Sequence, residues 1–344
     1  MLWEASLSEP LLLLGRPLGA SPVFRAESAD ADQTTRNNNH PLDTDSPARP
    51  ARTRTDLSTR CGEWIPWNVD GLPRGSHELT NEEVDEIMEF ENQVALVTGA
   101  AGAIGKAIAM RLVQEGARVF ISDLDQARLD AICAELGPNC RGLAADVTDQ
   151  AQVRRVVQAA LAALGNRIDV LINVAGMVGK GGPVEEMSLE NWEFVFAVNC
   201  RGTFLFTKEV VPVMKRSGHG NIVNFSSKSG KTGSALMSAY SAAKAAVIGF
   251  TQALAFELAP TIRVNCVCPG ITEDTGVWSN VSADYVQNLK LPMPEVVKKF
   301  TSKVPLGRLA RIDDVVNLTC FLASARADYM TGQAINVTGG REMH

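Results

Sequence analysis

From residue 94 onward, short runs rich in β-branched residues alternate with longer runs of helical periodicity, and this alternation constrains the fold more than any other feature. The predicted strands are Val94–Val97, Arg118–Ser122, Arg141–Ala145, Val170–Val174, Gly220–Phe225, Arg263–Val267 and Gln333–Val337. The predicted helices between them are Ile104–Glu115, Leu129–Leu136, Gln150–Leu164, Leu189–Lys215, Ser238–Ala259 and Ile312–Ser324. Near-continuous apolar strands separated by helices predict an α/β fold, a doubly wound parallel sheet with helices on both faces.

Residues 1–87 differ in composition from residues 88–344. The first segment contains no lysine, whereas the remainder contains eleven, and it is rich in Pro, Asp, Arg, Ser and Thr. Such a segment buries too little apolar surface to offset the entropy lost on ordering. We therefore expect a single catalytic domain over 88–344. The extension over 1–87 is expected to be mostly disordered, either as a non-catalytic tail or as an over-long start of the chain.

The overall composition excludes several classes of function. The chain is 45% hydrophobic with a net charge of -6, which argues against nucleic acid or an anionic membrane as the main partner. No run reaches the roughly 18 apolar residues of a membrane helix. The seven cysteines form no CxxC pair, and none of the four histidines has a second plausible ligand nearby, so no metal site is expected. These features predict a cytoplasmic protein with reduced thiols.

A small-residue turn follows the first predicted strand and opens the first predicted helix, from Thr98 to Gly105. Glycine and alanine let the backbone bend sharply and approach a pyrophosphate, which then lies on the amide dipoles of the helix. The alternative is an ordinary glycine-rich turn. The position after the first strand favours a dinucleotide site, whose candidate residues are Gly99, Ala101, Gly102, Ile104 and Gly105.

Asp123 ends the second predicted strand, where a carboxylate accepts hydrogen bonds from the adenosine ribose and repels a 2′-phosphate. No arginine occupies the turn or follows Asp123 directly, so the sequence favours NAD over NADP. Asp146 and Val147 follow the third strand and could flank the adenine. For Asp146, capping of the next helix is an equal alternative.

Tyr240 and Lys244 are four residues apart in a helical pattern, which places a phenol and an ammonium on one face. This pair alone is weak evidence of a site. It is accompanied by Ser227 after the fifth predicted strand and by Asn199 in the preceding helix, and the segment Asn173–Gly176 ends the fourth strand.

Together these motifs resemble the short-chain dehydrogenase/reductase family. The matching pattern is Thr98-Gly-x3-Ala-x-Gly105, Asn173-x-Ala-Gly176, Asn199, Ser227, Tyr240-x3-Lys244 and Pro269-Gly270, in the family's order across 88–344. Two positions depart from it, because Ala103 replaces the middle glycine and Val174 replaces a second asparagine. Neither departure removes a catalytic group.

The resemblance implies a Rossmann-type fold and roles for the matched residues. Tyr240 would exchange a proton with the substrate oxygen, and Lys244 would lower the pKa of that phenol and bind the nicotinamide ribose. Ser227 would orient the substrate oxygen, and Asn199 would hold a water that relays the proton. The further implied cofactor contacts are Asn173, Ala175, Gly176, Tyr240, Lys244, Pro269, Gly270 and Ile271. The family also implies a homotetramer or dimer through the helices of 189–215 and 238–259.

Finer resemblance concerns the substrate. Three segments, Ser227–Ser234, Lys303–Leu306 and the chain end Tyr329–Gly340, are similar to the sorbitol-6-phosphate 2-dehydrogenase branch, and the segment from Pro269 to Trp278 resembles diol dehydrogenases. Lys228 and Lys231 either meet a substrate phosphate or carboxylate, or are solvated loop lysines. The long connection that follows Ile271 and runs to about Val304 is a candidate lid.

Three hypotheses follow. The first is an NAD-dependent dehydrogenase acting on a small-molecule alcohol or ketone, namely a sugar alcohol, sugar or small diol. The second is an NADPH-dependent ketoreductase of an acyl-carrier thioester, against which Asp123 counts. The third is a nucleotide-binding protein without turnover, against which the intact pair of Tyr240 and Lys244 counts.

Overall fold

The structure is a computed structural model that describes residues 88–276, 278–279, 282 and 290–344. These residues belong to one compact unit, Gly75–His344. The predicted N-terminal extension lies outside the described residues, and so does part of the predicted lid. No helix of the described residues combines the length and apolar character that a membrane crossing requires.

A seven-stranded sheet in the order β3-β2-β1-β4-β5-β6-β7 forms the centre of the fold. Every pair of neighbouring strands is parallel. The strands are β1 Val94–Thr98, β2 Arg118–Ser122, β3 Cys140–Gly142, β4 Val170–Asn173, β5 Gly220–Phe225, β6 Ile262–Pro269 and β7 Ala334–Val337. This order confirms the predicted doubly wound parallel sheet.

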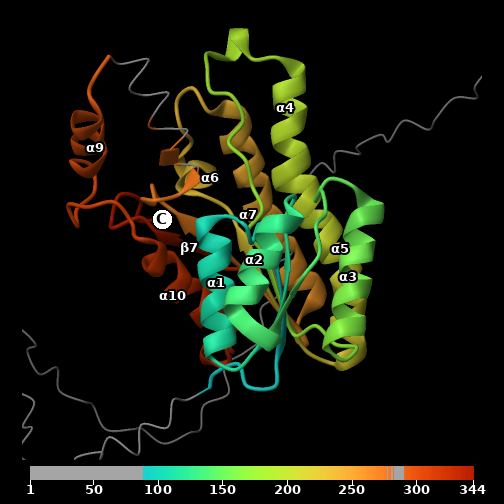
Figure 1. The fold of residues 1–344 in the computed structure, drawn as a ribbon. Helices are drawn as coiled ribbons and strands as arrows, with labels where there is room; N and C mark the ends of the chain where they lie inside the picture. The colour runs from blue at the N-terminus through green and yellow to red at the C-terminus, as the bar shows by residue number, and fades with distance from the viewer. Residues whose placement is uncertain (1–87, 277, 280–281, 283–289) are drawn as a thin grey trace, which may run out of the picture. The chain divides into compact units, whose positions relative to one another are not determined.

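Helices cover both faces of the sheet (Figure 1). The longer ones are α1 Ala103–Gln114, α2 Gln126–Leu136, α3 Gln150–Leu164, α4 Leu189–Phe196, α5 Gly202–Ser217, α7 Ser238–Leu258, α9 Met293–Thr301 and α10 Ile312–Ala323. Residues of α1, α2 and α10 share one hydrophobic core, and residues of α3, α5 and α7 share the other. Strand β1 shows why both faces must be covered, since Ala95 and Val97 enter the first core while Val94 and Leu96 enter the second.

The sheet order places the functional edge of the molecule. Strands β2 and β4 flank β1, and α1 after β1 and α5 between β4 and β5 pack on opposite faces of the sheet. In open parallel sheets such a reversal leaves a crevice beyond the carboxyl ends of the strands, where ligands bind. The small-residue turn after Thr98 and the end of β4 at Asn173 both lie at this edge.

Three local features differ from the predicted elements. The predicted helix Leu189–Lys215 is divided into α4 and α5 by a π-helical turn, Ala197–Arg201. A short helix, α6 Lys228–Thr232, follows β5 where a loop was expected. Strand β3 ends at Gly142, earlier than the predicted strand Arg141–Ala145. The π-helical turn accompanies a hydrogen bond from Asn199 to Met177, and α6 begins at the Ser227 cap.

Candidate active site

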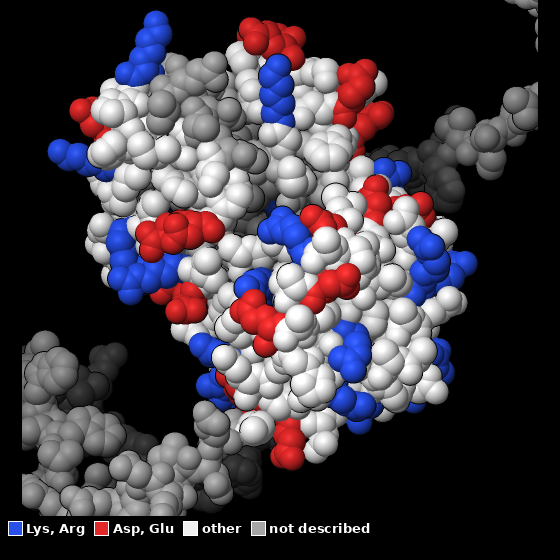
Figure 2. Space-filling view, viewed as in Figure 1, with Lys and Arg blue, Asp and Glu red and all other residues white. Residues whose placement is uncertain are grey.

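A cavity of about 1100 Å³ opens at the carboxyl edge of the sheet. Figure 2 shows this face of the molecule hollowed near its middle, with basic side chains at the rim. The predicted residues that line it are Gly99, Ala101, Gly102, Ile104, Gly105, Asp123, Asp146, Val147, Ala175, Gly176, Ser227, Tyr240, Lys244, Pro269, Gly270 and Ile271. The fold therefore brings the small-residue turn of residues 99–105 into one cavity with Ser227, Tyr240 and Lys244, which lie more than 100 residues further along the chain.

The turn between β1 and α1 forms a backbone cradle. Gly99 has a φ of +68°, and a Cβ placed there would lie 2.7 Å from the backbone nitrogen of Ala175. A Cβ on Gly105 would meet the carbonyl of Gly99, so neither position accepts a larger residue without movement. No described side chain caps the amino end of α1. Its amide groups remain available to an anion, and the turn fits the pyrophosphate of a dinucleotide.

Asp123 is fixed at the end of β2 by two backbone amides. One carboxylate oxygen accepts a hydrogen bond from Ala101 N–H at 2.9 Å, and the other accepts one from Leu124 N–H at 2.7 Å. The carboxylate therefore lies directly beside the cradle. Each of its oxygens keeps a lone pair for a ribose hydroxyl.

Sequence reasoning missed Arg128, which also lines the cavity. Its guanidinium donates to the carbonyl of Ala101 in the cradle, although it lies in the first turn of α2 rather than directly after Asp123. Its position, five residues after Asp123 and in the first turn of the next helix, was the signal in the sequence, because a long side chain there can extend back to the cradle.

Asp146 and Val147 line the cavity beyond β3. The carboxylate of Asp146 accepts a hydrogen bond from Thr148 N–H at 2.8 Å, whereas the residue that caps α3 is Asp149. The helix-capping alternative for Asp146 is therefore wrong.

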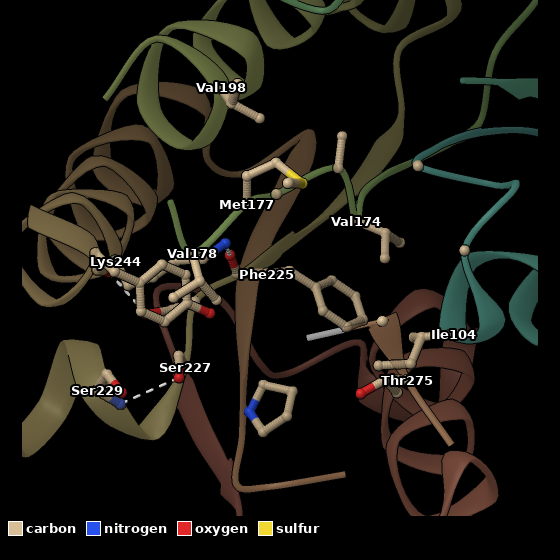
Figure 3. Close-up of a pocket in the computed structure, with 18 of the residues that line it drawn as sticks. Ile104, Val174, Met177, Val178, Val198, Phe225, Ser227, Ser229, Lys244 and Thr275 are labelled. Atoms are coloured by element: carbon tan, nitrogen blue, oxygen red, sulfur yellow. Dashed lines mark hydrogen bonds between the residues drawn. The ribbon is translucent and has the colours of Figure 1, made fainter. Parts of the chain in front are cut away.

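Tyr240 and Lys244 lie on one face of α7, beside Ser227. The Lys244 ammonium is 5.7 Å from the centre of the Tyr240 ring and donates to the carbonyl of Phe225 at 2.8 Å. Ser227 caps α6, and its Oγ accepts a hydrogen bond from Ser229 N–H at 3.1 Å. Figure 3 shows Ser227 and Lys244 on one side of the cavity, with Ile104 and Thr275 across from them.

Burial opposes the charged form of both groups on α7. It raises the pKa of the Tyr240 phenol to about 12, against a smaller lowering by the hydrogen bond with Ser227. It lowers the pKa of Lys244 to about 8. Without a further positive charge nearby, Tyr240 is therefore a neutral proton donor at physiological pH.

Asn199 lies behind the cavity wall and is fully buried at the π-helical turn. Its Nδ2 donates to the carbonyls of Met177 at 2.7 Å and Val195 at 2.8 Å, and its Oδ1 accepts from Met177 N–H at 3.3 Å. A Cβ on Gly176 would lie 2.8 Å from this oxygen and 3.0 Å from Lys244 Nζ. Only glycine at position 176 therefore leaves room for the Asn199 and Lys244 side chains to lie against the backbone there.

Asn173 and Ser226 take up structural positions. Asn173 does not line the cavity, because it is buried in the sheet and donates to Asn224 Oδ1 at 2.9 Å. Ser226 donates to the carbonyl of Lys244 at 2.7 Å, which anchors α7 to the end of β5. Ser227, rather than Ser226, is the serine beside Tyr240.

Apolar residues complete the wall between the two ends of the cavity. Val174, Met177, Val178 and Val198 surround it in Figure 3. Trp278 packs edge-on against Phe300 of α9 at 5.8 Å, and both line the cavity. The described part of the predicted lid therefore contributes to the site, while its closure stays a prediction. No group of three His, Cys, Asp or Glu side chains suited to a metal ion occurs among the described residues.

Comparisons with known proteins identify the family of the chain. Residues 93–286 match the family model of the short chain dehydrogenases. A sorbitol dehydrogenase of Cereibacter sphaeroides is 38% identical over 258 residues, which cover 74% of this chain and 100% of that protein.

Two solved structures show the same fold. An actinorhodin polyketide ketoreductase solved with NADPH is 38% identical, with a TM-score of 0.70 over 73% of this chain and 98% of its own. An NAD+-bound xylitol dehydrogenase is 32% identical, with a TM-score of 0.70 over 73% of this chain and 100% of its own.

Proposed function

The chain belongs to the short-chain dehydrogenase family, and from this membership we propose an NAD-dependent oxidoreductase that interconverts a secondary alcohol and a ketone on a sugar alcohol, sugar or small diol. One observation carries the proposal. A single cavity holds Asp123 beside the small-residue cradle and, among its other lining residues, the Ser227, Tyr240 and Lys244 side chains.

The cofactor, when bound, supplies a nicotinamide ring that exchanges hydride with the carbinol carbon. The cradle of Gly99 to Gly105 would hold its pyrophosphate, and Asp123 would accept hydrogen bonds from its adenosine ribose. The Lys244 ammonium would bind the second ribose near the reacting end.

The residues of the chain handle the proton. Ser227 orients the substrate oxygen toward the Tyr240 hydroxyl, which gives up a proton during ketone reduction and takes one during alcohol oxidation. The positive charge of Lys244 stabilises the phenolate that burial would otherwise disfavour. Asn199 fixes the cavity wall, because its buried amide donates to the carbonyls of Met177 and Val195, and its role as the holder of a relay water stays a prediction.

The preference for NAD is supported by the position of Asp123. A 2′-phosphate on the adenosine ribose would approach a carboxylate held by Ala101 N–H and Leu124 N–H. The negative charges of the phosphate and of the Asp123 carboxylate would repel each other strongly in a partly desolvated site. The NAD+-bound xylitol dehydrogenase and the sorbitol dehydrogenase among the relatives agree with NAD and with a polyol.

A second candidate is an NADPH-dependent ketoreductase of an acyl-carrier thioester. It is favoured by Arg128, a cation at the cradle that could pair with a 2′-phosphate, and by the likeness to the polyketide ketoreductase. The Asp123 carboxylate favours the first candidate over this one, because it would repel the 2′-phosphate of NADPH.

The test is a steady-state assay that follows reduced nicotinamide by absorbance. NAD and NADP are supplied in parallel with polyols, aldoses and vicinal diols, and NADH and NADPH with an acyl-thioester ketone. Turnover of a polyol, sugar or diol with NAD is the expected result. Activity confined to the thioester with NADPH would instead establish the ketoreductase.

We also propose that residues 88–344 carry this activity and that the protein is a homodimer or tetramer. The described helices expose large apolar side chains that an interface would cover, among them Trp192 on α4, Phe204 on α5 and Phe256 on α7.

A further inference from the structure

Besides Arg128, Arg201 and Lys244, three further basic side chains line the cavity that holds Ser227 and Tyr240. They are Lys228 at the start of α6, Lys303 just after α9, and Arg341 near the carboxyl end of the chain. We call them the basic cluster. The structure separates Lys228 from Lys231, which had seemed equivalent by sequence, because Lys231 does not line the cavity.

One carboxylate accompanies the cluster. Glu342 is 8% exposed, and its Oε1 lies 3.3 Å from Arg341 Nε and 3.8 Å from Lys228 Nζ. Its segment is anchored by hydrogen bonds between Thr338 Oγ1 and the backbone of Glu342 at 3.2 and 3.3 Å. Glu342 thus orients two of the cations but balances only one charge of three.

The positive charges that Glu342 does not balance repel one another within the basic cluster. The pKa of Lys228 is lowered, mainly by burial and then by the charges of Arg341 and Lys303, while Glu342 acts in the opposite direction. Lys303 makes no ion pair within the described residues. Cations that repel one another at the wall of a cavity favour an anion there, since it would relieve the repulsion and accept charge-assisted hydrogen bonds.

The phosphates of the cofactor have a separate place. The cradle that fits the pyrophosphate is formed by the turn between β1 and α1. The basic cluster is carried instead by α6, the turn after α9 and the C-terminal segment, and Lys228 directly follows Ser227.

Resting on the proposed function, we propose that the basic cluster binds an anionic group carried by the substrate. The substrate class is then a polyol or sugar chain that ends in a phosphate monoester or a carboxylate, with the reacting carbinol at Tyr240. A bidentate contact from Arg341 and a contact from Lys303 would fix the register of the chain and so select which hydroxyl is oxidised.

The experiment compares kcat/KM with NAD for glucitol, glucitol 6-phosphate and gluconate at constant ionic strength. Substitutions Lys303→Gln and Arg341→Gln each remove one cation, and Lys231→Gln is the matched control that removes a nearby charge outside the cavity. A charge-assisted hydrogen bond is worth about tenfold in affinity. We expect each cluster variant to lower kcat/KM for the preferred anionic substrate about tenfold through KM. The two cluster variants should turn over glucitol as the wild type does, and Lys231→Gln should leave kcat/KM for every substrate unchanged. The comparison of glucitol 6-phosphate with gluconate identifies the anionic group.

Equal activity on neutral and anionic substrates, or equal losses on both in the variants, would overturn the inference. A binding measurement separates this result from failure of the proposed function. Inorganic phosphate is titrated into the enzyme saturated with NADH, so that the cradle is occupied. Phosphate binding that weakens in Lys303→Gln and Arg341→Gln but not in Lys231→Gln supports the cluster even if no polyol is turned over. Equal binding by all variants contradicts it.

Discussion

At the scale of single residues, Lys244 must remain charged in a place that disfavours charge. It lies fully enclosed between Gly176, Phe225 and Tyr240, and burial lowers its pKa to about 8. The charged form therefore dominates below this pH and is lost above it. The same burial also strengthens the stabilisation of the Tyr240 phenolate by the Lys244 ammonium, because water screens the charge less inside the protein.

This balance predicts the pH dependence of ketone reduction. The pKa of Tyr240 is raised to about 12, so the phenol keeps its proton across the working range, while Lys244 loses its proton above about 8. We expect the reduction rate to fall above pH ~8, and expect Lys244→Arg to move that fall to higher pH because guanidinium stays protonated. The measurement is kcat/KM against pH for both enzymes. Superimposable profiles would show that Lys244 does not set the fall.

Asp123 and Arg128 predict a change of cofactor preference. Asp123→Ser removes the carboxylate that would repel a 2′-phosphate and leaves the Arg128 guanidinium beside the cradle. We expect the ratio of kcat/KM for NADP to that for NAD to rise at least about tenfold. Asp130→Asn, on the exposed side of α2, should leave the ratio unchanged. An unaltered ratio in Asp123→Ser would remove the argument for NAD.

The sequence predicted residues that belong to local motifs and missed those that only the fold assembles. Helical spacing placed Tyr240 and Lys244 on one face, the accompanying motifs and the family resemblance identified them as site residues, and both line the cavity. Lys303 and Arg341 were not predicted as site residues, although the segment Lys303–Leu306 carried part of the resemblance, because only the packing of the C-terminal segment beside α6 brings them to Lys228. Arg128 was overlooked because its contact runs back along a helix.

At the scale of elements, the turn between β1 and α1 depends on glycine. Gly99→Ala introduces a φ penalty of about 1–2 kcal/mol and places Cβ against the backbone of Ala175. We expect the variant to unfold at lower temperature and to bind NAD at least about tenfold more weakly. Calorimetry measures both quantities.

A glycine of α7 supplies the control for this prediction. A Cβ on Gly249 meets nothing within 4 Å, so Gly249→Ala should stabilise the protein by about 0.5–1 kcal/mol and leave NAD binding intact. If Gly99→Ala bound NAD as tightly as Gly249→Ala does, the cradle would not be the pyrophosphate site.

Regular elements were predictable for a physical reason that irregular ones lack. Strands covered on both faces favour continuous apolar runs, and β1 and the middle of β2 follow that pattern, whereas β5 is interrupted by the buried Asn221 and Asn224. The π-helical turn at Asn199 has no such pattern, because it accompanies a side chain that bonds Met177 and Val195 instead of solvent. π-Helical turns are frequent at functional sites, which agrees with its place behind Lys244.

At the scale of the whole molecule, the alternation of strands and helices predicted the layers, whereas the family resemblance supplied the functional edge. The predicted assembly stays a prediction, and Phe256 offers the test, since it lies on α7 with 90% of its surface exposed. We expect analytical ultracentrifugation to find a dimer or tetramer, and expect Phe256→Glu to lower the mass by burying a charge in the interface.

The control for the assembly test is Leu306→Glu, which is exposed but lies outside α4, α5 and α7. It should leave the mass unchanged. A wild-type monomer, or equal masses for wild type and Phe256→Glu, would contradict an interface through α7.

The central claim is that Tyr240 exchanges the proton at the reacting oxygen, and Tyr240→Phe tests it most directly. The substitution keeps the ring beside Lys244 and removes the hydroxyl. We expect kcat to fall by about 10²–10⁴ with the affinity for NADH unchanged, as for the loss of a general acid or base. Tyr329→Phe, at a fully exposed tyrosine, should retain full activity. A Tyr240→Phe enzyme that kept near-normal turnover would contradict the mechanism.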